Sequence, residues 1–99
     1  MKNFKITEKA GSDLESIWLY TFQNWSLEQA DRYYDLIMNE IVFLSENPSA
    51  GRIADHIRKG YRVSRVKSHL IFYKNDPDGF IIVIRILHCS MDIENRIEA

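Results

Sequence analysis

The sequence contains a single cysteine, Cys89, among its 99 residues. One cysteine cannot form an internal disulfide, so we expect the fold to rely on a hydrophobic core and the protein to be cytoplasmic. A metal site built from several thiolates is likewise excluded. No motif that would activate a thiol surrounds Cys89, and we therefore interpret it as a packing residue.

Long hydrophobic runs and ligand-binding motifs are also lacking. The longest apolar run, residues 80–84, is too short to span a bilayer and is typical of a strand, and residues 1–7 do not resemble a signal peptide. The four glycines form no phosphate-binding loop. His56, His69 and His88 lack the close ligand pair usual in zinc sites. The sequence therefore predicts no metal, no cofactor and no membrane partner.

What is present is typical of one soluble globular domain. The chain is 45% hydrophobic and 27% charged, and no repeat or linker divides residues 1–99. In the first half, apolar residues at helical spacing from Ala10 to Trp25 follow a plausible N-cap, Thr7. Ser26, with Gln29 three residues later, is typical of the start of a second helix, which should end before Pro48.

The second half has the alternation of strands, over residues 61–66, 68–74 and 80–88, and a further short strand is expected around residues 4–6. A tight turn is expected near Lys67, and residues 90–98 could form one or two helical turns. The predicted fold is therefore α+β. An N-terminal α-helical hairpin packs on a small antiparallel β-sheet of three or four strands, with the N-terminal strand at an edge.

The strand at residues 80–88 is apolar on both of its alternating faces. A strand of that kind must be covered on both sides, and the helical hairpin can cover only one of them. The short C-terminal segment would be a small lid for the other. We therefore expect a binding partner to cover this second face.

Charge is distributed unevenly along the chain. Residues 1–50 carry four basic and eight acidic side chains, whereas residues 51–99 carry nine basic and six acidic ones. Within residues 51–74, seven basic side chains accompany a single acid, Asp55. Such a segment attracts an acidic partner, although it could also be a solvated sheet edge that discourages aggregation.

One catalytic alternative survives, a metal-free ribonuclease that uses arginines and a histidine on the sheet. Arg85 and His88 are three residues apart on a strand, so their side chains should point to opposite faces. Arg85 would instead pair with a carboxylate such as Asp92. Residues 89–99 contain three acidic side chains and no Tyr, Lys or His. That segment is therefore poorly suited to bind an RNA backbone.

Several blocks of the sequence resemble those of ParE toxins, the gyrase-directed branch of the RelE/ParE toxin superfamily. They are GSDLESIWLYT (11–21), WSLEQA (25–30), NPSAGR (47–52), HLIFY (69–73) and RILHCSMD (85–92). The resemblance implies a RelE/ParE-like fold and the toxin of a bacterial type II toxin–antitoxin system. It further implies a ParD-like antitoxin, two of each chain per complex, and DNA gyrase as the target. The toxin would then be no enzyme and would not bind nucleic acid itself; the alternative is a RelE-like ribosome-dependent mRNA endoribonuclease.

Such an antitoxin would fold on binding, and its acidic and apolar residues would meet the basic segment and the second sheet face. The residues predicted to bind the antitoxin combine these two features: Arg52, Arg58, Arg62, Arg65, Phe72, Arg85 and His88.

Overall fold

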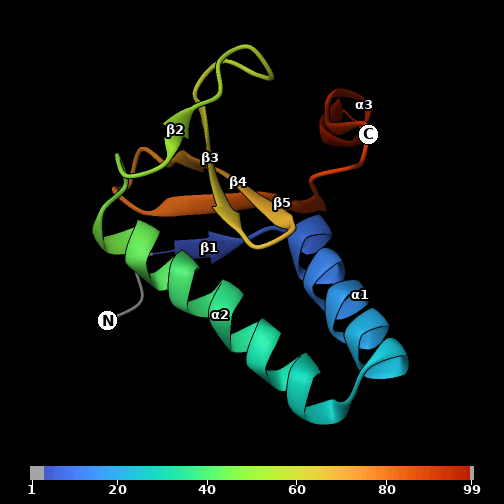
Figure 1. Ribbon diagram of the computed structural model, residues 1–99. Helices are drawn as coiled ribbons and strands as arrows, with labels where there is room; N and C mark the ends of the chain where they lie inside the picture. The colour runs from blue at the N-terminus through green and yellow to red at the C-terminus, as the bar shows by residue number, and fades with distance from the viewer. Residues whose placement is uncertain (1–3, 99) are drawn as a thin grey trace.

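Helices occupy the first half of the chain and most of the sheet occupies the second half (Figure 1). The computed structural model describes residues 4–98. The elements in chain order are β1 (Phe4–Ile6), α1 (Glu8–Asn24), α2 (Leu27–Glu46), β2 (Arg52–Ile53), β3 (Tyr61–Val66), β4 (His69–Asn75), β5 (Ile81–His88) and α3 (Ile93–Glu98). No helix in this range is both long and apolar enough to cross a membrane.

The two long helices begin at the predicted caps. The Thr7 hydroxyl accepts a hydrogen bond from the Ala10 amide at 3.1 Å, and the Ser26 hydroxyl accepts one from the Gln29 amide at 3.1 Å. Each bond satisfies one of the amides that a first helical turn leaves without a partner. The predicted helical hairpin is confirmed.

The sheet has five strands in the order β1-β5-β4-β3-β2, where three or four were predicted. The pairs from β2 to β5 are antiparallel as expected, but β1 lies parallel to β5 at the edge. β2 has only two residues, too few to show the alternation of a strand in the sequence. β1 has three, and a pattern of three residues does not indicate whether the strand runs parallel or antiparallel to its neighbour. The expected tight turn between β3 and β4 contains Lys67 with a positive φ of 54°.

The sheet is the middle layer of three (Figure 1). On one side the α1–α2 hairpin buries a core in which Ile37 and Ile41 of α2 pack with Ile71 and Val83 of the sheet. On the other side lie α3 and the segment that joins β2 to β3.

That third layer corrects the expectation of a face left for a partner to cover. Phe72 and Leu87, on the face turned away from the hairpin, are 2% and 1% exposed. They pack in one cluster with Ala54 and Ile97, and with the partly buried Ile57 and Ile93. The short C-terminal helix and the β2–β3 segment together cover much more of the sheet than their lengths suggested.

Candidate protein-binding site

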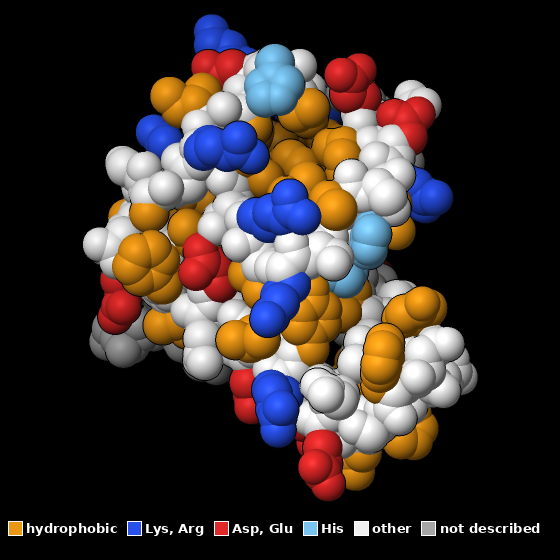
Figure 2. All heavy atoms as spheres, in the orientation of Figure 1, with side chains coloured by type: hydrophobic (Ala, Val, Ile, Leu, Met, Phe, Trp, Pro, Cys, Tyr) orange, Lys and Arg blue, Asp and Glu red, His pale blue; other side chains and the backbone are white. Residues whose placement is uncertain are grey.

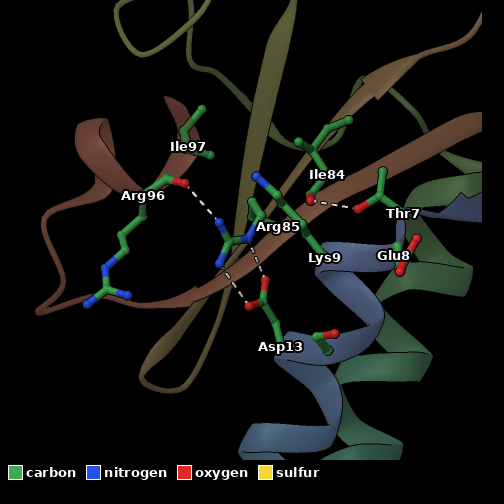
Figure 3. Close-up of a pocket in the computed structure, with 9 residues that line it drawn as sticks. Thr7, Glu8, Lys9, Asp13, Ile84, Arg85, Arg96 and Ile97 are labelled. Carbon is green, nitrogen blue, oxygen red and sulfur yellow. Dashed lines mark hydrogen bonds and ion pairs between the residues drawn. The ribbon is translucent and has the colours of Figure 1, made fainter. Parts of the chain in front are cut away.

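Arg85 lies at the edge of the sheet, where β5 extends past the end of β1, and it contacts α1 and α3 (Figure 3). Its Nε is 2.8 Å from Asp13 Oδ2 and its Nη2 is 3.0 Å from Asp13 Oδ1, while its Nη1 donates to the Arg96 carbonyl oxygen at 2.8 Å. Asp13 Oδ2 also accepts the Ile86 amide at 2.9 Å. The Asp13 carboxylate raises the pKa of Arg85 above its ordinary value.

The carboxylate partner expected for Arg85 was one such as Asp92, and it is Asp13 instead. The Arg85 and Asp13 side chains are only 13% and 14% exposed. They form the floor of a hollow of about 820 Å³ between α1, β5 and α3 (Figure 3). Through these bonds Arg85 joins β5 to α1 and α3. Every nitrogen of its guanidinium already has a partner, so the group has little hydrogen-bonding capacity left for a ligand.

Arg62 and Arg65 of β3 also make internal contacts. Arg62 Nη1 donates to the carbonyl oxygens of Gly51 at 2.7 Å and of Ser49 at 3.3 Å. Arg65 Nε donates to the Lys67 carbonyl oxygen at 2.6 Å, and its Nη2 lies 3.8 Å from Cys89 Sγ. Arg62 therefore holds the loop after α2 against the sheet, whereas Arg65 remains exposed at the β3–β4 turn.

Arg52 and Arg58 are exposed, on β2 and in the segment after it. Figure 2 shows Lys and Arg side chains one above another down the face turned toward the viewer, over β3 and below it, with hydrophobic side chains between them. Phe72 lies beneath the covering layer and is nearly inaccessible. Of the residues predicted to bind the antitoxin, Arg52, Arg58 and Arg65 are therefore exposed, whereas Phe72 is buried and Arg85 is nearly so.

His88 lies on the hairpin side of the sheet, opposite His69 in register, and the two rings meet edge to face with 5.2 Å between centroids. The Tyr33 hydroxyl donates to the Val66 carbonyl oxygen at 3.1 Å and is 2.7 Å from His69 Nδ1. Burial, with the neighbouring His88, lowers the pKa of His69 from 6.5 to about 4. His69 is therefore neutral at pH 7, and Arg85, opposite Phe72, faces away from His88.

A groove of about 510 Å³ opens beside these histidines, between the tip of the helical hairpin and the β3–β4 turn. We call it the tip groove. Trp25 and Tyr20, which line it, are 75% and 64% exposed. Arg32 and Lys67 lie in its wall, which contains no carboxylate among the residues that the structure describes.

Sequence reasoning missed the tip groove. Trp25 was assigned to the core-facing stripe of the first helix, and this assignment is wrong, because the helix ends at Asn24 and Trp25 lies in the turn. Lys67 was predicted to lie at a tight turn and to belong to a basic run, but neither prediction connects it with the helical hairpin. A tryptophan directly before a capping serine gives no clear signal, because apolar residues are common at that position and usually pack on the helix that follows.

Comparison with known proteins gives consistent results. The sequence profile of the family described as "ParE toxin of type II toxin-antitoxin system, parDE" matches residues 4–93. "Toxin ParE1" of Mycobacterium tuberculosis is 35% identical over 94 residues, which cover 95% of this chain and 96% of the relative. "Toxin ParE1" of Caulobacter vibrioides is 35% identical over 92 residues, covering 93% and 94%.

A solved structure titled "Chromosomal ParDE TA system from P. aeruginosa" superposes with a TM-score of 0.77. The match covers 91% of this chain and 98% of that one, at 22% identity. At that identity the likeness supports the fold, and the family follows from the sequence relatives.

Proposed function

Because the chain belongs to the ParE toxin family of type II toxin–antitoxin systems, we propose that a ParD-like antitoxin neutralises it and that it acts by inhibiting DNA gyrase. The observation that carries the non-enzymatic part of this proposal is the state of Arg85. Its guanidinium is held by Asp13 and Arg96, on the side of the sheet away from His88. Inhibition of gyrase requires only a complementary surface, whereas RNA cleavage requires several groups that converge on one phosphate.

The proposed antitoxin surface is the edge formed by β2, the segment after it and β3. Arg52, Arg58 and Arg65 are exposed there, and Ile53 is 62% exposed on a two-residue edge strand. An acidic and apolar segment that becomes ordered on binding fits such an edge, because carboxylates can pair with the arginines while an apolar side chain packs on Ile53. Antitoxin dimerisation would give a complex of two toxins and two antitoxins in the cytoplasm.

The full set predicted to bind the antitoxin, Arg52, Arg58, Arg62, Arg65, Phe72, Arg85 and His88, stays a prediction. Within it we expect the exposed arginines to contribute most to the affinity. Phe72 and Arg85 already have partners inside the toxin, and could contact an antitoxin only if α3 moved aside.

Two assays on the purified toxin test the proposal. We expect the toxin to inhibit supercoiling by DNA gyrase, and the co-expressed antitoxin to reverse the inhibition. An Arg52→Glu, Arg58→Glu toxin should bind the antitoxin at least about tenfold more weakly and still inhibit gyrase. Primer extension on a translated reporter mRNA is the second assay. Codon-phased cuts with unimpaired supercoiling would contradict the proposal in favour of the endoribonuclease alternative.

A further inference from the structure

The exposed apolar surface of this protein is concentrated on the helical hairpin. Eleven large hydrophobic side chains are exposed among the described residues, and nine of them fall between residues 19 and 43. The two most exposed of all, Trp25 and Tyr20, line the tip groove, and Leu36, 39% exposed, lies in the same wall. A cluster of that kind on a small domain is typical of a protein-binding surface, and exposed Trp and Tyr are frequent anchors at such surfaces.

The charges of the tip groove differ from those of the hairpin around it. Residues 8–46 carry eight acidic and two basic side chains. One of those two, Arg32, lies in the groove, and Lys67 of the β3–β4 turn supplies the second cation. Within the described part of the chain, neither side chain forms an ion pair or a side-chain hydrogen bond. The groove thus presents two cations that are available to an anionic group, beside aromatic rings.

The floor of the groove is held in place, and its His69 is neutral at pH 7. Tyr33 on α2 is tied to Val66 and His69 of the sheet, which fixes the hairpin relative to the β3–β4 turn. Arg32 of α2 and Lys67 of the β3–β4 turn supply the two permanent cations of the groove. Lys67 occupies a left-handed turn position that glycine or asparagine would adopt more readily.

We propose that the tip groove is the site at which the toxin binds its protein target, and that the target segment carries carboxylates beside an apolar or aromatic side chain. The carboxylates would pair with Arg32 and Lys67, and the apolar group would pack on Trp25, Tyr20 and Leu36. This inference rests on the proposed function. It adds that the target occupies the hairpin side of the sheet, beside His88, so that we expect the antitoxin to bind at the exposed arginines of the β2–β3 edge and not at His88.

A nucleic acid fits the groove less well than a short acidic segment. The neighbouring hollow on the outer side of α2 is lined by Glu28, Asp31 and Asp35 together with Arg32. A phosphate backbone that continued past Arg32 would meet these three carboxylates and be repelled. A protein segment needs only the two cations and the apolar wall.

Charge reversal at the groove tests the proposal. We expect an Arg32→Glu, Lys67→Glu toxin, and separately a Trp25→Ala toxin, to need at least about tenfold more protein for half-inhibition of supercoiling by purified gyrase. Both should lose growth arrest in cells and keep the wild-type affinity for the co-expressed antitoxin, which also shows that they fold. The matched controls are Lys59→Glu with Lys74→Glu, both exposed, and Phe43→Ala at the other end of α2. They should inhibit like the wild type.

Three results would overturn the inference. The groove variants could inhibit gyrase and arrest growth as well as the wild type does, or they could lose antitoxin affinity together with inhibition. The wild type could also bind a single-stranded oligonucleotide that the Arg32→Glu, Lys67→Glu toxin does not bind. Failure of the proposed function gives a different result, in which the wild-type toxin leaves supercoiling unimpaired. In that case the growth-arrest comparison still decides whether the groove binds the target.

Discussion

Two regions of this protein are rich in apolar side chains, and the chain buries one of them and leaves the other exposed. The sheet face away from the hairpin, whose strand pattern pointed to a partner, is buried by the chain itself, with Phe72 and Leu87 at 2% and 1% exposure. The hairpin, whose pattern pointed to a single core-facing stripe, exposes Trp25 to 75% and Tyr20 to 64%. Apolar residues on both faces of a strand therefore show that both faces are covered, but they do not show whether the chain itself or a partner covers them.

This comparison predicts that replacing a large aromatic residue by alanine will lower stability much more on the buried sheet face than on the exposed hairpin. Phe72→Ala should lower the free energy of unfolding by about 4 kcal/mol, because it leaves a cavity in the cluster between the sheet and the layer that covers it. Trp25→Ala should lower it by less than about 1 kcal/mol, because the indole is mostly in water. Urea unfolding of both variants measures the difference. If Phe72→Ala does not fold, Phe72→Leu should still lose more than Trp25→Ala. Equal losses would show that the two surfaces are not distinct.

The second prediction concerns the contact that joins the hairpin to the third layer. Asp13→Ala should lower the free energy of unfolding by about 3 kcal/mol, because it leaves the nearly buried Arg85 guanidinium without its counter-ion and Ile86 without its acceptor. Asp31→Ala is the control, since Asp31 is exposed and accepts one hydrogen bond, from Trp18 Nε1 at 2.9 Å. It should lose less than about 1 kcal/mol in the same measurement. Similar values for the two variants would contradict a structural role for the Arg85 pair.

The third prediction concerns the loop that leads from α2 into the basic edge. The Tyr73 hydroxyl accepts the Gly51 amide at 2.9 Å and donates to the Pro48 carbonyl oxygen at 2.8 Å. Tyr73→Phe should therefore lower the unfolding free energy by about 2 kcal/mol, because it leaves two backbone groups unpaired. Tyr61→Phe removes a hydroxyl that forms no hydrogen bond within the described residues, and should have almost no effect. A Tyr73→Phe protein as stable as the wild type would argue against this anchoring.

The smallest predicted effect concerns the floor of the tip groove. The folded-state pKa of His69, about 4, lies below its ordinary 6.5. The unfolded chain therefore takes up the proton first, and the stability contributed by neutral His69 is full above about pH 6.5 and is lost as the pH falls toward 4. Because His69 is only half-buried, we expect about 1 kcal/mol of extra loss between pH 7 and pH 5, relative to His69→Gln. Urea midpoints at the two pH values that change equally in both proteins would contradict this.

The sequence predicted those parts of the fold that depend on local patterns. Thr7 and Ser26 are recognisable caps, and β3, β4 and β5 are runs of six to eight residues rich in β-branched, aromatic and other apolar side chains. A C-terminal helical turn that acts as a small lid was predicted and is present as α3. β2 is too short for such a pattern, so neither this strand nor the share of the third layer that the β2–β3 segment provides could be predicted.

The candidate site depended more on tertiary contacts. Asp13 and Arg85 are 72 residues apart, and no local rule favours that pairing over one with Asp92. The tip groove combines residues of the hairpin turn with the β3–β4 turn, and only the packing of α2 on the sheet brings them together. Exposed arginines such as Arg52 and Arg58 follow from composition alone, which is why the basic edge could be predicted.

Hydrogen–deuterium exchange of the toxin, free and in its complex with the co-expressed antitoxin, tests most directly the claim that two surfaces bind two partners. We expect the antitoxin to slow amide exchange in residues 52–66 and to leave residues 18–30 and 67–69, around the tip groove, unchanged. Protection centred on residues 18–30, with no change in residues 52–66, would contradict the account, because the antitoxin would then occupy the surface that we assign to the target.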